Sequence, residues 1–215
     1  KFAGQTWRIV RINEDGTIRI VMQDGINSNA DIAFNSNYNN YSYMYYTNSQ
    51  AKTTLERWYQ TNIGSKADLA ENVATGDYYC EQAKVKLDDS YTSGSATMTT
   101  YNKYTPDFKC SSDGNGKGIV NVSIGLLSYD EVVYAGGYYD QNNSSYYLYN
   151  SAIYWWTMSP AGFSDSYATV WRVASGYVGY GNVASTYRLR PVLNLNDNTK
   201  ISSGNGTKEN PFVVQ

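Results

Sequence analysis

The chain contains no histidine, only two cysteines and only four prolines, and charged residues make up 17% of its 215 residues. The absence of histidine removes the most common general base and a favoured metal ligand. A formal net charge of −2 gives no electrostatic reason to expect nucleic acid or an anionic membrane as the partner. No apolar run approaches the roughly 20 residues that a membrane-spanning helix needs. The length suits one large domain with a substantial core.

The two cysteines, Cys80 and Cys110, flank a polar segment rich in Gly, Ser and Asp. Neither stands in a C-x-x-C spacing or near a histidine, which argues against a zinc site. A bond between them would restrain the segment by lowering the entropy of the unfolded chain. We expect a disulfide, as in an exported protein, with two free thiols as the alternative. The chain opens at Lys1 rather than at a methionine, so an export or anchoring segment could precede it.

Tyrosine is abundant, with 23 copies. Tyr, Ser, Asn and Gly together are typical of antibody-like binding surfaces, where Tyr supplies rigid contact area and the others supply adaptable hydrogen bonds. A Tyr-rich extracellular β protein with ordinary half-buried tyrosines is the other interpretation that the composition allows.

Local patterns predict two strands and a helix in the first third of the chain. "WRIVRI" and "TIRIVMQ" flank the turn sequence "NEDG" at 13–16, which predicts a hairpin. The stretch from Gly25 to Asn48 is crowded with Asn, Ser and Tyr, and we expect a long surface loop with at most a short strand. Ser49 can cap a helix over about 50–62, whose apolar residues share one face: Leu55, Trp58, Tyr59 and Ile63.

A loop-rich insertion is expected at about 77–118, with a brief strand or turn at 81–86. In "LLSYDEVVYAGG", Ser128 and Glu131 form a capping box, and Gly136 stops the second helix. The remainder predicts short strands near 154–158, 170–173, 177–178 and 189–195. These elements predict one α+β domain over 1–215, in which two helices lie between an N-terminal hairpin and a C-terminal set of short antiparallel strands.

Several motifs resemble one family. "YWWTMSPAGF", the spaced valines after it and "LRPVLNL" are similar to the C-type lectin fold domains of gut-bacterial and phage proteins, which are related in fold to formylglycine-generating enzymes. Members of that group serve as variable proteins of diversity-generating retroelements. The N-terminal "FAGQTWRIVRINEDGTIRIVMQDG", "AKTTLERWYQTNI", "GLLSYDEVVYAGG" and "GNGTKENPFVV" extend the resemblance over most of the chain.

The resemblance implies a C-type lectin fold that presents one hypervariable face near the C-terminus. Mutagenesis at template adenines turns Asn codons into many others, but never into Lys, Glu, Gln, Trp or Met, and the chain has no Lys, Glu or Gln between Gln141 and Lys200. The implied ligand-binding residues are Asp165, Tyr167, Arg172, Ala174, Tyr177, Gly179, Tyr180, Asn182, Ala184, Ser185 and Arg188. The alternative for this region is a fixed carbohydrate-binding or core-rich segment.

Among these residues, tyrosines and arginines deserve the most weight because both are enriched at interface hot spots. The alternative for Tyr177 is a half-buried packing residue, and for Arg188 a salt-bridged framework residue. Arg190, in the fixed "LRP", is assigned to structure. Trp155 and Trp156 could stack sugar rings, but adjacent strand residues face opposite ways, so we expect Trp156 in the core.

The sequence therefore predicts a non-catalytic receptor or adhesin, extracellular or on a cell surface, whose partner is a protein or glycan on a cell, host or phage surface. No metal, cofactor or nucleic acid is expected. An enzyme would need carboxylates such as Asp130 and Glu131, and Glu131 is better explained by its cap. A calcium-dependent lectin needs several oxygen ligands, of which the C-terminal region offers Asp165 and Asp197. A structural surface or pilus subunit is the third alternative.

Overall fold

The computed structural model describes residues 1–76, 78–82, 108–110, 118–139, 141–164 and 166–215. Within these ranges the protein is a mixed α+β structure with more strands than helices. The strands are β1 (Trp7–Ile12), β2 (Ile18–Met22), β3 (Ile32–Ala33), β4 (Tyr79–Cys80), β5 (Ile119–Val120), β6 (Tyr138–Tyr139), β7 (Tyr154–Ser164), β8 (Tyr167–Ala174), β9 (Tyr177–Asn182), β10 (Thr186–Tyr187), β11 (Val192–Leu195), β12 (Ile201–Ser203) and β13 (Val213–Val214). The helices are α1 (Ile26–Asn29), α2 (Gln50–Tyr59), α3 (Ala67–Ala70) and α4 (Tyr129–Tyr134).

The N-terminal hairpin forms where the sequence predicts it. Strands β1 and β2 pair antiparallel, and the turn between them closes with a 2.8 Å hydrogen bond from the Asn13 amide to the Thr17 carbonyl. Gly16 supplies the positive φ, +85°, that this turn requires. Strand β11 pairs with the free edge of β2, so a late segment of the chain completes the first sheet.

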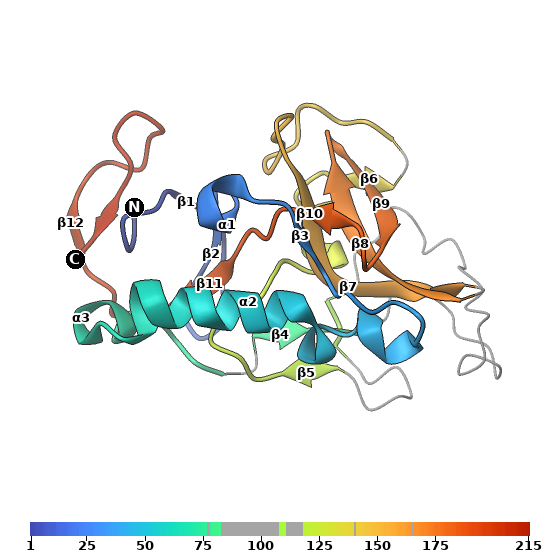
Figure 1. Cartoon of the computed structure of the whole chain (residues 1–215). Helices are drawn as coiled ribbons and strands as arrows, with labels where there is room; N and C mark the ends of the chain where they lie inside the picture. The colour runs from blue at the N-terminus through green and yellow to red at the C-terminus, as the bar shows by residue number, and fades with distance from the viewer. Residues whose placement is uncertain (77, 83–107, 111–117, 140, 165) are drawn as a thin grey trace.

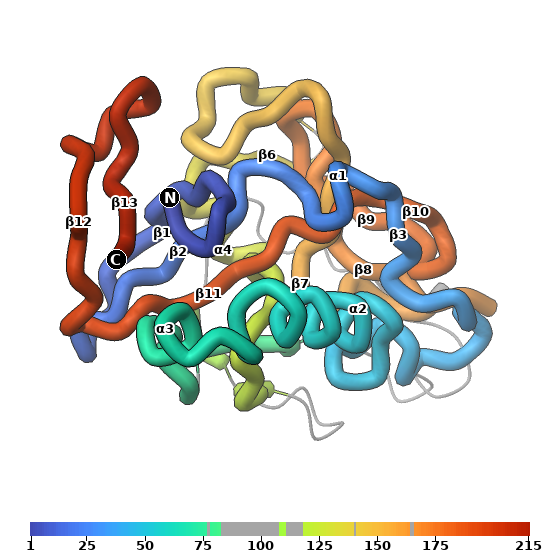
Figure 2. Tube along the Cα trace, turned by 60° about the vertical axis from the view of Figure 1, so that its left-hand side comes forward, coloured from blue at the N-terminus to red at the C-terminus, as the bar shows by residue number. Residues whose placement is uncertain are grey.

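Helix α2 confirms the predicted cap and apolar face. The Ser49 side chain accepts a hydrogen bond from the Lys52 amide at 3.0 Å. The helix continues through a π-helical turn at Gln60–Gly64, and its four predicted inward residues are all buried: Leu55, Trp58, Tyr59 and Ile63. In both views α2 lies alongside β11, where these side chains join the core (Figure 1, Figure 2).

A four-stranded sheet with the order β6-β9-β8-β7 forms one end of the molecule, and the β12–β13 hairpin with both termini lies at the other (Figure 1). Strands β8 and β9 are joined by only two residues, Ser175 and Gly176, with φ of +42° and +99°. Two left-handed residues give a turn whose twist matches that of the flanking strands. A Cβ at Gly176 would lie 2.3 Å from Asn142 Oδ1 and 3.0 Å from the Asn143 carbonyl oxygen, so the position requires glycine.

The prediction of a surface loop from Gly25 to Asn48 is wrong in its burial. The predicted short strand is present as β3, which pairs with β10. Five large side chains of this segment are nevertheless fully buried: Ile26, Phe34, Met44, Tyr45 and Tyr46. The Tyr46 hydroxyl, for example, donates to the Ile124 carbonyl at 3.0 Å. Irregular spacing concealed these residues, because a core contributed by turns and 3₁₀ segments has no helical or strand period.

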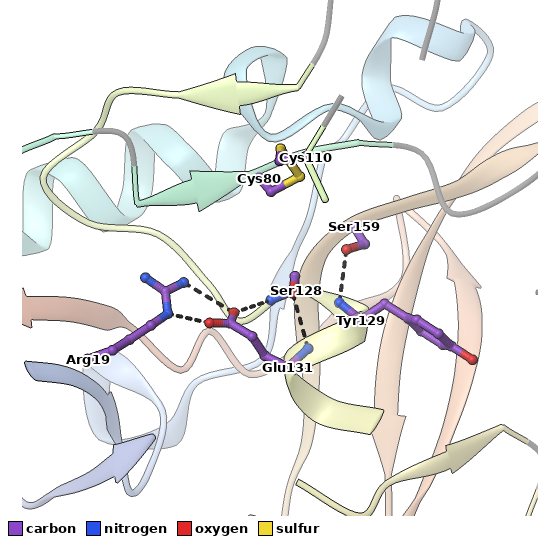
Figure 3. The surroundings of a disulfide bond; sticks show 7 residues. All are labelled: Arg19, Cys80, Cys110, Ser128, Tyr129, Glu131 and Ser159. Atoms are coloured by element: carbon purple, nitrogen blue, oxygen red, sulfur yellow. Dashed lines mark hydrogen bonds and ion pairs between the residues drawn. A yellow bond between two sulfur atoms is a disulfide. The ribbon is translucent and has the colours of Figure 1, made fainter. Parts of the chain in front are cut away.

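The capping box of α4 and the disulfide are both present (Figure 3). The Ser128 hydroxyl accepts from the Glu131 amide at 3.2 Å, and the Glu131 carboxylate accepts from the Ser128 amide at 2.8 Å. Cys80 and Cys110 are bonded, with 5.8 Å between their Cα atoms. Most of the predicted insertion at 77–118, including residues 83–86 of the expected strand, lies outside the described residues. None of the helices in the described ranges has the length and apolarity that crossing a bilayer requires.

Candidate ligand-binding face

The residues predicted to contact a ligand divide between the two faces of the β8–β9 hairpin. Arg172 pairs with Gly179, and Trp171 pairs with Tyr180. Paired residues project to the same face of a sheet, and adjacent residues project to opposite faces. One face therefore carries Arg172, Ala174, Tyr177 and Gly179, and the other carries Tyr167, Tyr180 and Asn182.

On the first face, two tyrosine rings lie against Arg172, and a third tyrosine lies beside one of them. The guanidinium carbon lies over two rings, 5.7 Å from the Tyr177 centroid and 5.2 Å from the Tyr187 centroid. The ring of Tyr154, which is 46% exposed, lies 6.3 Å from that of Tyr187. We call Tyr154, Arg172, Tyr177 and Tyr187 the tyrosine–arginine cluster. Because Tyr and Arg bring large area and directed hydrogen bonds to interfaces, this cluster is the candidate contact surface.

The floor of the tyrosine–arginine cluster is a buried aromatic layer. Trp156 is fully buried, which confirms its expected place in the core, and its ring lies 4.6 Å from that of Tyr187 and 5.7 Å from that of Phe34. Its indole N–H donates to the Ile32 carbonyl at 3.0 Å. A tightly packed layer of this kind holds the side chains above it in place.

Two glycines of β9 leave the space in which the cluster lies. A Cβ at Gly179 would lie 3.2 Å from the Tyr177 ring, and one at Gly181 would lie 3.2 Å from the Tyr187 ring and 3.4 Å from Arg172 Cδ. These positions are two residues apart on one strand, so they face the same way. Gly179, predicted as a contact residue, thus contributes to the face by lacking a side chain.

The other predicted contact residues lie outside the tyrosine–arginine cluster. Ala174 is fully buried, and Tyr180 is 41% exposed but lies on the second face, with its ring 6.1 Å from that of Trp171. The Asn182 side chain accepts from the Ala184 amide and its carbonyl accepts from the Ser185 amide, both at 2.9 Å, so these three residues form a turn. Tyr167 is half-buried, and Asp165 lies outside the described residues.

The two arginines after β10 belong to the framework. Arg188 forms an ion pair with Asp31 at 2.7 Å, which favours a salt-bridged framework residue over a ligand contact. Arg190 is 1% exposed, and its Nε donates to the Met22 carbonyl at 3.0 Å, which fits its assignment to structure. Its guanidinium lies 4.8 Å from the Trp155 ring centroid, and burial lowers the pKa of Arg190 to about 10.

Sequence reasoning missed two members of the cluster, Tyr154 and Tyr187. Tyr154 and Trp156 are two residues apart in β7, so alternation places both on one face, and Tyr154 lies at the start of the strand, where it is 46% exposed. Tyr187 reaches the cluster through the pairing of β10 with β3, more than 150 positions away in the sequence. No local pattern shows such a contact.

Of the two carboxylates considered for catalysis, Glu131 has a structural role and Asp130 is buried. Glu131 is buried and pairs with Arg11 and with Arg19, whose Nε lies 2.5 Å from Glu131 Oε1 (Figure 3). Burial raises the pKa of Glu131, but the two guanidinium groups and the Ser128 amide outweigh it and hold that pKa below its ordinary value. The described residues also contain no group of three or more Cys, Asp or Glu side chains arranged to hold a metal ion.

A cavity of about 1290 Å³ lies beside the disulfide, between β1, β2 and α4. Two of the carboxylates that line it have internal partners: Glu131 is ion-paired, and Asp15 accepts a 2.6 Å hydrogen bond from the Tyr78 hydroxyl. Glu14, Asp130 and Lys109 also line the cavity.

Comparison with known proteins adds no relative: no family model, no curated protein and no solved structure matches this chain.

Proposed function

We propose that the protein is a non-catalytic receptor or adhesin with a C-type lectin fold, and that it binds its ligand through the tyrosine–arginine cluster. The observation that carries this proposal is the placement of partly exposed Tyr and Arg side chains on a fully buried aromatic floor. A preformed face avoids the ordering cost that a flexible loop pays on binding. The disulfide is typical of a chain that folds in an oxidising compartment, which supports an extracellular or cell-surface location.

The proposal includes diversification of this face by a retroelement. The framework residues of the C-terminal region are all buried, namely Val170, Val173, Val178, Val183 and Leu189. Arg172 and Tyr177, which lie between them, are partly exposed. Surface substitutions generally change stability by no more than about 0.5 kcal/mol, so one framework tolerates many different surfaces. Ligand identity would then differ between sister sequences.

A fixed-specificity carbohydrate-binding lectin is the second candidate. The exposed Tyr154 ring favours it, because an aromatic ring beside polar groups suits a sugar. This candidate is supported over a diversified receptor if all copies of the gene encode the same residues at the cluster and the protein binds a glycan.

Binding of the fluorescently labelled protein to intact bacterial and host cells, measured by flow cytometry, tests the proposal. We expect saturable binding to one cell type, and loss of that binding in Tyr177→Ala. Tyr134→Ala is the matched control, since Tyr134 is 75% exposed and belongs to α4, outside the cluster. If both variants bind cells equally, the cluster does not contact the ligand. If the protein binds no cell type, a structural subunit is favoured.

A further inference from the structure

Arg172 is a cation whose Nε and Nη1 donors have no acceptor among the described residues. Its Nε and Nη1 atoms are buried without a hydrogen-bond partner, and Arg172 forms no hydrogen bond or ion pair within the described part of the chain. Its contacts are instead the Tyr177 and Tyr187 rings. A guanidinium is always charged and carries five N–H donors, and unpaired buried donors are costly. A guanidinium that lacks an acceptor and lies in a candidate contact surface suits an acceptor on the ligand.

The third guanidinium nitrogen, Nη2, is not among the buried side-chain atoms that lack a hydrogen-bond partner. Because Nε and Nη1 are buried, Nη2 is the donor that an acceptor on the ligand can reach, and a hydrogen bond from a guanidinium to a carboxylate is strengthened by charge. A Cβ at Gly181 would lie 3.4 Å from Arg172 Cδ, so the glycine leaves room for the arginine stem, and the guanidinium lies against the Tyr177 and Tyr187 rings.

The charge of the surroundings favours a single negative charge on the ligand. Arg188 is paired with Asp31, and Arg190 is buried against Trp155, so neither adds a free cation to the cluster. One guanidinium matches one carboxylate in charge, whereas its tyrosine neighbours supply hydroxyls and ring area for the rest of the ligand.

We infer that Arg172, held over Tyr177 and Tyr187, binds a carboxylate of the ligand through a charge-assisted hydrogen bond from Nη2. The inference rests on the proposed function, since it names the chemistry that the tyrosine–arginine cluster recognises. The carboxylate can come from an acidic sugar or from a Glu or Asp side chain.

The test is a titration of ¹⁵N-labelled protein, with the Arg172 Nε–Hε signal identified by its absence from Arg172→Lys. N-acetylneuraminic acid and acetyl-glutamate amide are the two carboxylate probes, and N-acetylmannosamine and acetyl-glutamine amide are their neutral counterparts. We expect a saturable shift of the Arg172 signal with a carboxylate probe only, and no shift of the Arg57 signal, because Arg57 lies on α2. The probe that binds more tightly identifies the source of the carboxylate.

Arg172→Gln should weaken binding of that probe by about tenfold to a hundredfold, measured through backbone amide signals. Arg57→Gln is the matched control and should leave the affinity unchanged. The inference is overturned if neither carboxylate gives a saturable shift, or if the neutral probes act equally. If Arg172→Gln still binds cells, the receptor proposal stands and carboxylate recognition by Arg172 is wrong. If the protein binds a carboxylate probe but no cell, carboxylate recognition stands and the receptor proposal is wrong.

Discussion

Arg19 and Arg172 occupy similar aromatic surroundings in two regions of the molecule, but they differ in their partners. Arg19, in the sheet β1-β2-β11, lies 4.8 Å from the Tyr79 ring centroid, is 2% exposed and is ion-paired with Glu131. Arg172, in the sheet β6-β9-β8-β7, lies over two tyrosine rings and has no ion pair among the described residues. Both are arginines over tyrosines, so the rings do not explain the difference. The difference is the carboxylate: Glu131 pairs with Arg19 in the first region, whereas no carboxylate of the described residues pairs with Arg172 in the second.

This difference separates a stabilising site from a binding site. A buried charge left without its partner destabilises a protein strongly, so the Arg19 region depends on Glu131 for its folding. A partly exposed charge such as Arg172 keeps some hydration and tolerates the absence of a partner until a ligand arrives. The comparison predicts large stability effects on one side and large binding effects on the other.

The largest effect on stability is expected for Glu131→Gln. This change leaves Arg19 and Arg11 without their carboxylate and weakens the capping box, and we expect it to lower the free energy of unfolding by about 3–5 kcal/mol. Urea denaturation at pH 7 measures the loss. Asp68→Asn, on the short helix α3, is the control, and a similar loss for both variants would contradict the special role of Glu131.

The same carboxylate predicts a pH dependence. Since folding lowers the pKa of Glu131, its contribution is complete above the pKa of an unfolded Glu, about 4.3, and is lost as the pH falls through the lower folded value. Wild type should therefore lose stability below about pH 4 more steeply than Glu131→Gln. Parallel pH profiles for the two proteins would show that Glu131 is not the responsible group.

A direct comparison of the two arginines is given by replacing each with lysine. Arg19→Lys loses the planar fork that serves Glu131, and should cost about 2–3 kcal/mol of unfolding free energy. Arg172→Lys loses no hydrogen bond to any described residue and should change stability by no more than about 0.5 kcal/mol. Thermal and urea denaturation of both variants measure these changes. Equal losses of unfolding free energy would show that the two arginines do not differ in their structural role.

A smaller effect on stability is expected for Gly181→Ala. The added Cβ would lie 3.2 Å from the Tyr187 ring, 3.3 Å from Trp156 and 3.4 Å from Arg172 Cδ, so neighbouring side chains must shift. We expect a cost of about 1 kcal/mol from overpacking, together with a change in the Arg172 Nε–Hε signal. Denaturation and NMR measure the two effects, and an unchanged arginine signal would mean that Gly181 does not position Arg172.

The smallest stability effects are expected for natural variation at the cluster. Sequencing the 3′ end of this gene across its source population should find substitutions at Arg172 and Tyr177, while Val170, Val173 and Val178 stay fixed. Variants at the first two positions should remain within about 0.5 kcal/mol of each other in stability. Variation no greater than in the α4 segment would reject diversification by a retroelement.

Local signals allowed much of the framework to be predicted from sequence. The turn at 13–16, the Ser49 cap and the Ser128–Glu131 capping box each act within a few residues, and all three are confirmed. The candidate site was predicted less completely because it depends on contacts between distant segments. Tyr187 is positioned in the site by the pairing of β10 with β3, whereas the ion pair with Asp31 makes Arg188 part of the framework.

The two-residue turn at Ser175–Gly176 also limits how this region can evolve. Because the turn fixes the register of β8 against β9, inserting or deleting one residue within either strand would exchange the inward and outward side chains beyond it. Trp171, now packed with Tyr129 and Tyr139, would then be carried to the side where Arg172 lies. Substitutions at the partly exposed positions of this hairpin therefore keep its register, whereas a one-residue insertion or deletion within a strand would expose buried framework side chains.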